Sequence, residues 1–211
     1  MNRKGILIVV SGFSGSGKGT LMKELLSRYA DTYALSISAT TRSPREGEEH
    51  GREYFFITKD EFEKMIVKGE LIEYARYVEN YYGTPREYVE KMLDEGRDVI
   101  LEIEIQGALK VKKAFPDTLL LFVTPPDATE LKNRLVGRGT ETLDVIKSRL
   151  DRACEEAEGM DSYDYLIVND DLNECVEKMH TIIQGEHHRS FRNKAFMKEI
   201  KEDLQRLKGE D

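Results

Sequence analysis

Hydrophobic residues near the start of the chain change from a continuous run to a helical spacing. Residues 5–10 form a short apolar run that is long enough for one buried strand. Beyond a glycine-rich segment, apolar residues recur at the spacing of one helix face, at Leu21, Met22, Leu25, Leu26 and Tyr29. The pattern therefore predicts a strand, a loop and a helix in immediate succession.

Further apolar runs predict the remaining strands of a core sheet, over residues 33–38, 99–105, 119–123 and 165–169. Helical spacing predicts the helices that accompany these strands, over residues 85–96, 131–136, 146–157 and 172–183. Strands that alternate with helices are typical of an α/β fold in which helices flank a parallel sheet. We therefore expect an α/β protein with a parallel core sheet.

Residues 35–84 interrupt this alternation, and we interpret them as a compact insertion between the first two units of the main sheet. Its polar segment, residues 39–47, carries two arginines and on pattern alone is a solvated loop. Thr58 and Glu61 have the spacing of a capping box and predict the start of a helix.

The end of the chain carries a separate apolar stripe at helical spacing, at Phe191, Ala195, Phe196, Ile200, Leu204 and Leu207. This stripe predicts an amphipathic C-terminal helix within residues 190–211. We expect its apolar face to be buried, either against the rest of the chain or against a second subunit in a homo-oligomer.

The glycine-rich segment has the spacing of a phosphate-binding loop, with Gly12, four residues, then Gly17 and Lys18. Glycine lets successive backbone N–H groups converge on one anion. The helix N-terminus adds a partial positive charge, and Lys18 adds a full one. An ordinary glycine-rich turn is the alternative. Ser or Thr usually follows the lysine and reaches Mg²⁺, but here Gly19 precedes Thr20, which leaves direct metal coordination by Thr20 open.

Glu102 and Glu104 share one face of the predicted strand over residues 99–105. Like charges near the end of a core strand need a cation, a donor or a proton. The carboxyl end of such a strand is also where open α/β sheets bind ligands. The alternative is an amphipathic edge strand with one wet face.

Arginines gather around a second glycine-containing loop, residues 137–142. Arg134 and Arg138, together with Arg149 and Arg152 on the next helix, form a basic cluster of the kind that a closing lid would carry. For Arg152, we prefer the interpretation of a solvated helix face.

Composition narrows the class of ligand. The 211-residue chain has a net charge of −8, which argues against binding a nucleic-acid polymer. The two cysteines, Cys154 and Cys175, form no metal-binding or redox pair and are read as incidental thiols in a reducing compartment. The N-terminal apolar run is too short for a secretion signal, and no stretch is long enough to span a membrane. We therefore expect a cytoplasmic protein with no membrane partner.

A series of motifs then points to a family. In chain order they are Gly12-Phe13-Ser14-Gly15-Ser16-Gly17-Lys18-Gly19-Thr20, residues 38–45, residues 72–74, residues 80–84, residues 102–107, residues 137–141 and residues 167–171. With these motifs the chain resembles guanylate kinase over nearly its whole length, up to about Gln184. The phosphate loop alone would indicate only a nucleotide phosphate.

The resemblance implies a three-part fold. It comprises a P-loop core over residues 1–34, 85–124 and 154–189, a GMP-binding insertion over residues 35–84, and a small helical lid over residues 125–153. It also implies that the γ-phosphoryl group of ATP is transferred to GMP, giving ADP and GDP in purine nucleotide recycling. Mg²⁺ is the implied cofactor, and dGMP is an implied second acceptor.

The resemblance also assigns roles to single residues. ATP is expected on the loop from Gly12 to Thr20, with its phosphates on Arg134, Arg138 and Arg149. The GMP phosphate is expected on Arg42, Arg45, Tyr54 and Tyr82, with Glu48 in the same GMP-binding set. Lys18, Arg42, Arg138 and Arg149 are the expected catalytic residues.

Guanine is expected to be read by Ser38, Glu73 and Thr84, the two hydroxyls donating protons toward O6. Glu102 and Glu104 stand where the family commonly has Asp. We expect Glu102 toward the waters of Mg²⁺, with Thr20 beside it, and Glu104 toward the guanosine.

Two other functions are compatible with parts of the pattern. The first is a guanylate-kinase-like module that binds protein partners and has weak or no catalysis, although the intact loop and Lys18 count against it. The second is a kinase of the same architecture that acts on another acceptor such as adenylate, against which Glu73 argues.

Overall fold

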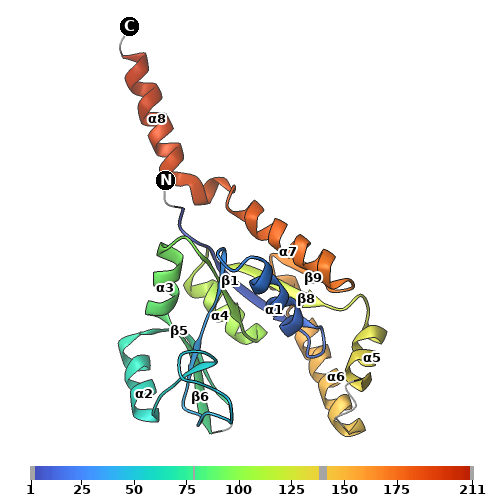
Figure 1. Ribbon diagram of the computed structural model, residues 1–211. Helices are drawn as coiled ribbons and strands as arrows, with labels where there is room; N and C mark the ends of the chain where they lie inside the picture. Colours follow the sequence, from blue (N-terminus) through green and yellow to red (C-terminus); the bar gives the residue numbers. More distant parts are fainter. Residues whose placement is uncertain (1–2, 78, 138–141, 210–211) are drawn as a thin grey trace. The chain divides into compact units, whose positions relative to one another are not determined.

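The computed structural model describes residues 3–77, 79–137 and 142–209 (Figure 1). The strands are β1 (Leu7–Gly12), β2 (Tyr33–Leu35), β3 (Ser38–Thr40), β4 (Tyr54–Phe56), β5 (Leu71–Tyr77), β6 (Asn80–Pro85), β7 (Asp98–Glu102), β8 (Leu119–Thr124) and β9 (Tyr165–Val168). The α-helices are α1 (Lys18–Arg28), α2 (Lys59–Lys68), α3 (Arg86–Asp94), α4 (Ile105–Ala114), α5 (Ala128–Gly137), α6 (Leu143–Ala157), α7 (Leu172–Glu186) and α8 (Lys194–Lys208). Contacts divide the chain into two units, residues 1–170 and residues 171–211.

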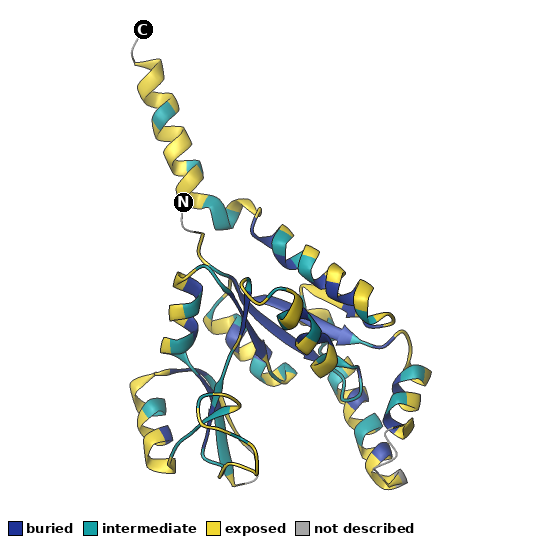
Figure 2. Cartoon of the chain, viewed as in Figure 1, coloured by how far each residue is buried: buried dark blue, intermediate teal, exposed yellow. Residues whose placement is uncertain are grey.

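The core of the first unit is a five-stranded parallel sheet in the order β2-β7-β1-β8-β9. The central strand β1 carries Ile8, Val9 and Val10, none of which has any exposed surface. Strands covered on both faces in this way are typical of a parallel sheet between helices. Figure 2 shows the central strands β7, β1 and β8 mostly in the colour of buried residues. The predicted α/β class is confirmed.

Side-chain alternation along the strands divides the core into two layers. Leu7 and Val9 belong to one hydrophobic cluster with Leu101 of β7, Val89 of α3 and Ala108 of α4. Ile8 and Val10, which alternate with them along β1, point to the other face of the sheet. Helix α1 completes the core by burying Leu21, Met22 and Leu25.

The predicted insertion forms its own small sheet, in the order β4-β3-β6-β5. Phe62 of α2 is fully buried beside Ala39 and Leu71 in a hydrophobic cluster of this sheet. The capping box of α2 is confirmed, because Thr58 and Glu61 each accept a hydrogen bond from the other's backbone N–H. The domain boundaries at residues 34 and 84 stay predictions; β2 and β6 each continue one residue beyond them.

The strand predicted over residues 99–105 is shorter than expected. Strand β7 ends at Glu102, and α4 begins at Ile105 with Glu104 as its N-cap residue. The Ser11 hydroxyl donates a hydrogen bond of 2.7 Å to the carbonyl of Ile103, so a side chain satisfies this backbone group where the ladder has stopped. Glu102 and Glu104 therefore do not share a strand face. Glu104 instead lies at a helix N-terminus, where a negative charge is favourable.

The second unit consists of α7, a short 3-10 helix over Ser190–Asn193, and α8. Asp171 caps α7 by accepting a hydrogen bond of 3.0 Å from the backbone N–H of Glu174. No residue of α8 is buried, as Figure 2 shows. The apolar stripe of α8 is therefore not buried within the described residues of the second unit, where Leu204 and Leu207 are 61% and 63% exposed. Its expected burial against the first unit or a second subunit stays a prediction.

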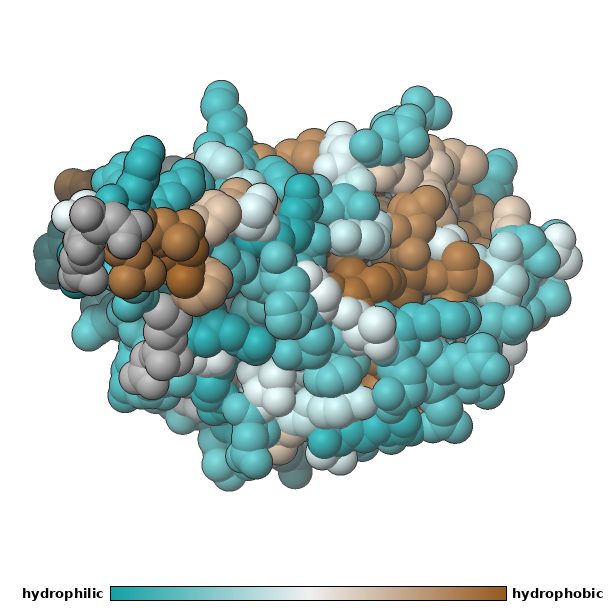
Figure 3. Space-filling model, turned by 90° about the horizontal axis from the view of Figure 1, so that it is seen from above, coloured by the Kyte–Doolittle hydropathy of each residue, from teal (hydrophilic) through white to brown (hydrophobic). Residues whose placement is uncertain are grey.

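Among the described residues, no helix combines the length and the apolar character that crossing a membrane would require. The face that Figure 3 shows is mostly hydrophilic, with separate hydrophobic patches.

Candidate active site

The loop between β1 and α1 leaves the helix N-terminus open to an anion. Gly17 is the N-cap residue of α1, and no side chain caps the helix there. The first backbone N–H groups of α1 are therefore available to a ligand. Lys18 is the first residue of the helix. The predicted loop thus has the backbone geometry that phosphate binding requires.

Close packing and backbone conformation explain why two positions of the loop are glycine. Gly17 has a φ of 84°, and a Cβ there would lie 2.5 Å from the side-chain nitrogen of Asn169. Gly15 has a φ of 96°, and a Cβ there would lie 2.9 Å from Leu135 of α5. Any larger residue would strain the backbone and push these neighbours away.

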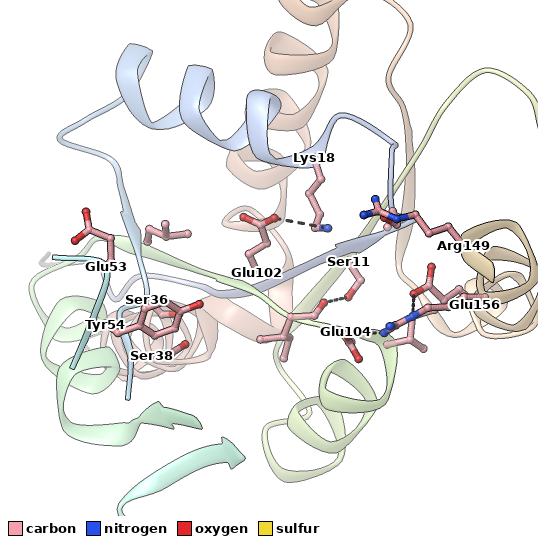
Figure 4. Close-up of a pocket in the computed structure, with 16 residues that line it drawn as sticks. Ser11, Lys18, Ser36, Ser38, Glu53, Tyr54, Glu102, Glu104, Arg149 and Glu156 are labelled. Atoms are coloured by element: carbon pink, nitrogen blue, oxygen red, sulfur yellow. Dashed lines mark hydrogen bonds and ion pairs between the residues drawn. The ribbon is translucent and has the colours of Figure 1, made fainter. Parts of the chain in front are cut away.

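A cavity of about 730 Å³ opens at the carboxyl ends of the core strands. Its lining includes Ser14 and Lys18 of the loop, Glu102 at the end of β7, and Arg149 of α6. Lys18 Nζ lies 3.6 Å from Glu102 Oε1, and Arg149 donates a hydrogen bond of 3.1 Å to the Ser14 hydroxyl (Figure 4). The loop, a carboxylate and a cation from a distant helix therefore meet at one site.

The insertion contributes the opposite wall of this cavity. Ser38 and Tyr54 line it and also line a second cavity of about 450 Å³, which Glu73 and Tyr82 border as well. Ser38 and Tyr54 face the core cavity in Figure 4. The two cavities share these residues, so a ligand in one lies next to a ligand in the other.

Glu73 and Thr84 interact directly across neighbouring strands. The Thr84 hydroxyl donates a hydrogen bond of 2.8 Å to Glu73 Oε1. This differs from the expected donation toward guanine O6, because a hydroxyl has one proton and here Glu73 receives it. Burial raises the pKa of Glu73, against the opposing effects of Thr84 and Lys110. The carboxylate is thus oriented from one side and partly desolvated.

The strand that carries Thr84 also carries Tyr82, two positions earlier. Alternation along β6 turns both toward the same face and Gly83 toward the other. A Cβ on Gly83 would lie 2.8 Å from the carbonyl oxygen of Glu73 and 3.0 Å from Phe62. Close packing of β5 and α2 therefore leaves no room for a side chain at this position of β6.

Arg42 is held beside the cavities and does not line either of them. Its guanidinium lies 3.0 Å from Glu48 and 5.5 Å from the centre of the Tyr54 ring. Partial burial lowers the pKa of Arg42, but Glu48 and Tyr82 outweigh this effect and the pKa is raised overall. Glu48 also accepts a hydrogen bond from the backbone N–H of Arg45. The expected phosphate-binding residues therefore form one connected group.

The side chain of Arg134 contacts the backbone of the phosphate loop. It donates hydrogen bonds of 3.3 Å to the carbonyl of Ser16 and 2.9 Å to that of Asn169, and it pairs with Glu130 at 2.7 Å. Its expected contact with ATP phosphates stays a prediction, because these partners already engage much of its guanidinium. Arg138, Gly139, Thr140 and Glu141 lie outside the described residues.

Arg152 is a site residue that the sequence interpretation missed. Its side chain is 47% exposed, yet it lines both cavities and lies 2.6 Å from Glu104. The expected solvated helix face is therefore only part of its environment. Its spacing of three from Arg149 was a usable signal, since residues three apart lie on the same side of a helix.

The residues present fit a magnesium ion bound together with a nucleotide. Thr20, Lys18 and Glu102 line a third cavity beside the loop. Within residues 3–77, 79–137 and 142–209, no group of three or more His, Cys, Asp or Glu side chains is placed to hold a metal by itself. Mg²⁺ usually takes one or two carboxylates plus waters and substrate phosphates. A single carboxylate and a hydroxyl therefore suit it.

The fold and this site define a P-loop nucleotide-binding protein of α/β class with an inserted sheet. A family model described as guanylate kinase matches residues 4–186. A guanylate kinase of Bacillus anthracis is 54% identical over 203 residues, covering 96% of this chain and 99% of that protein. One of Bacillus subtilis (strain 168) is 52% identical over 187 residues, covering 89% and 92%.

The crystal structure of guanylate kinase from Anaplasma phagocytophilum is similar in fold. Its TM-score is 0.69 at 31% identity, and the match covers 90% of this chain and 89% of that chain. The chain belongs to the guanylate kinase family.

Proposed function

We propose that this protein transfers the γ-phosphoryl group of ATP to GMP, giving ADP and GDP, with dGMP as a second acceptor. The observation that carries the proposal is the shared lining of the two cavities. Lys18 and Ser14 of the phosphate loop line the first cavity, Glu73 lines the second, and Tyr54 lines both. A donor phosphate and an acceptor nucleotide can thus lie side by side. The guanylate kinases among its relatives support this choice of substrates.

Phosphoryl transfer needs alignment and charge neutralisation more than covalent help. In the proposed complex, Lys18 and the open N-terminus of α1 hold the donor phosphates. Arg149 adds a second positive charge from α6, and its guanidinium can bind a phosphate through two N–H groups. These cations offset the repulsion between donor and acceptor phosphates.

We propose that Thr20 and Glu102 hold Mg²⁺ together with the nucleotide phosphates and water. When bound, the ion offsets the negative charge of the phosphoryl oxygens. The chain's own residues keep the site ready for it, since Lys18 balances Glu102 at 3.6 Å. The cytoplasm is the proposed location because ATP and GMP are available there.

A coupled assay with ATP and a panel of nucleoside monophosphates tests the activity and the acceptor together. GMP and dGMP should be phosphorylated, and AMP should react far more slowly. Absence of turnover with every monophosphate would leave the non-catalytic binding module as the better description. A preference for AMP would favour the adenylate alternative.

Replacing Arg42 should weaken use of the acceptor. We propose that its guanidinium leaves Glu48 for the GMP phosphate, which an ammonium cannot bind through two parallel N–H groups. Arg42→Lys should therefore raise the KM for GMP, and Arg42→Ala should cost about 2–5 kcal/mol in kcat/KM. Steady-state kinetics with GMP varied at saturating ATP measure both. Arg52→Ala is the matched control, because Arg52 also forms ion pairs in the insertion but is not one of the expected phosphate-binding residues.

The exposed stripe of α8 suits pairing with a second copy of the chain, and we propose a homo-oligomer formed through this helix. Leu204→Glu should then lower the mass measured by light scattering, because a charge in an apolar interface is unfavourable. Val67→Glu is the matched control, since Val67 on α2 is 88% exposed and lies outside the stripe. Ending the chain after Arg189 should have the same effect as Leu204→Glu. Equal masses for all these variants and the wild type would refute the pairing.

A further inference from the structure

Arg152 connects two carboxylates that come from different parts of the fold. From α6 it donates a hydrogen bond of 2.6 Å from Nη2 to Glu104 Oε1, although the two residues are 48 positions apart. Its Nε donates a hydrogen bond of 3.2 Å to Glu156 Oε1, one helical turn later on α6. Both contacts are drawn as dashed lines in Figure 4. Arg152 thus bridges α6 and the N-terminus of α4.

This bridge adds little to the stability of the fold. Arg152 is 47% exposed and Glu104 is 72% exposed, and exposed ion pairs contribute little because solvent screens them. The main effect of the bridge is therefore on the charges of the site. Glu102, Glu104 and Glu156 all line the larger cavity, which in the proposed function receives anionic nucleotides. Lys18 balances the first of them, and Arg152 balances the other two.

The geometry also leaves one oxygen of Glu104 for a ligand. Glu104 Oε1 accepts from Arg152, and within the described part of the chain no other side chain or backbone group donates to Oε2. Glu104 and Arg152 also line the second cavity together with Glu73. Holding Glu104 by one oxygen restricts the positions that its long side chain can take, and this lowers the entropy lost when a ligand binds.

We propose that Arg152 is a positioning residue of the acceptor site: it holds Glu104 so that Oε2 faces a donor group of the bound acceptor nucleoside. The inference rests on the proposed function, because it takes GMP as the acceptor. In this proposal Arg152 acts through Glu104, which accepts from its Nη2, while its Nε donates to Glu156. The chemical class of ligand is a nucleoside monophosphate with an exocyclic amine or a ribose hydroxyl within reach of Glu104.

The test is a double-mutant cycle on the full chain with Arg152→Gln, Glu104→Gln and the double variant. For each, the dissociation constants of GMP and of ATP are measured by calorimetry, and KM and kcat by the coupled assay. Arg152→Gln should weaken GMP binding roughly two- to fivefold, the range that one exposed ion pair can supply, and leave ATP binding unchanged. The double variant should be no worse than Glu104→Gln alone, because the two residues then act as one unit.

Two further variants check that the effect is specific. Arg152→Lys restores a charge without the planar fork, so its GMP affinity should lie between those of Arg152→Gln and the wild type. Arg28→Gln is the control, because Arg28 also forms an exposed pair on a helix, 2.7 Å from Glu24, but lines neither cavity. It should bind GMP as the wild type does. Melting curves of all variants should coincide.

The outcomes separate this inference from the proposed function. A wild type that binds GMP without phosphorylating it overturns the proposed function, while the calorimetric cycle still decides the role of Arg152. An active wild type whose GMP affinity is unaffected by Arg152→Gln overturns the positioning role. Additive losses in the double variant, or equal losses for GMP and ATP, also overturn it, because Arg152 would then act on the phosphates directly.

Discussion

Lys18→Ala should lower kcat by at least about 10²-fold, the scale on which removing one preorganised donor from a charged transition state acts. Lys18 is the full positive charge of the phosphate loop, and its side chain lies on the cavity 3.6 Å from Glu102. The substitution should leave the melting temperature nearly unchanged, because the charged end of the side chain lies on the cavity and not in the core. The measurement is single-turnover kinetics with ATP and GMP, beside a thermal melt.

Lys59→Ala is the matched control for this prediction. Lys59 also stands at the first position of a helix and pairs with a glutamate, Glu63, at 3.8 Å, but it lies outside the cavities. Its kcat should equal that of the wild type. Near-native turnover by a well-folded Lys18→Ala variant would contradict the proposal that the loop binds the donor phosphates.

Glu73→Gln should reduce kcat/KM for GMP far more than for AMP. Guanine presents N1–H and the N2 amine side by side, and one ionised carboxylate can accept from both. Each hydrogen bond to a charged group contributes about 1.5–3 kcal/mol. Sites that demand such a partner can discriminate by ~10⁴ or more. Adenine would place a lone pair against the carboxylate, so the variant should narrow the ratio of GMP to AMP. Equal losses for both acceptors would exclude Glu73 as the reader of the base.

The raised pKa of Glu73 supplies a second measurement of the same role. Burial raises this pKa, so the carboxylate takes up a proton at a higher pH than a free glutamate does. As pH falls through this raised pKa, Glu73 becomes protonated and its two oxygens can no longer both accept hydrogen bonds from guanine. The kcat/KM for GMP should therefore fall. AMP carries the same phosphate, so the GMP-to-AMP ratio isolates the base. Glu73→Gln should abolish the pH dependence of this ratio, whereas Glu70→Gln, at an exposed position just before β5, should retain it.

Features that depend on neighbouring residues could be predicted from the sequence. The phosphate loop is one continuous segment, so its glycines, Lys18 and the flanking strand and helix are all visible in the spacing. The capping box of Thr58 and Glu61 is likewise local, and the structure confirms it. The parallel core sheet followed from apolar runs long enough to be buried on both faces.

Features that depend on distant partners could not be predicted in this way. The pattern of residues 99–105 alternates as a strand should, but the Ser11 hydroxyl takes the Ile103 carbonyl and the strand ends. The proton of Thr84 goes to Glu73, a choice set by the register of β5 against β6. Arg152 could be given its partner only once α6 and α4 were placed in space. Periodicity also marks an apolar helix face, as in α8, without saying what covers it.

The spacing of residues along β6 limits the length of the nucleotide that the proposed acceptor site can bind. Tyr82 and Thr84 stand on one face of the strand about 7 Å apart, which in the proposed complex sets the distance between the phosphate end and the base end of the nucleotide. Inserting one residue between them would turn one of the two to the opposite face of the strand, whatever its identity. The evolution of this segment should therefore accept exchanged side chains far more readily than changes in length. Substitutions in this segment can change which nucleotide is accepted, while the length of the accepted nucleotide stays the same.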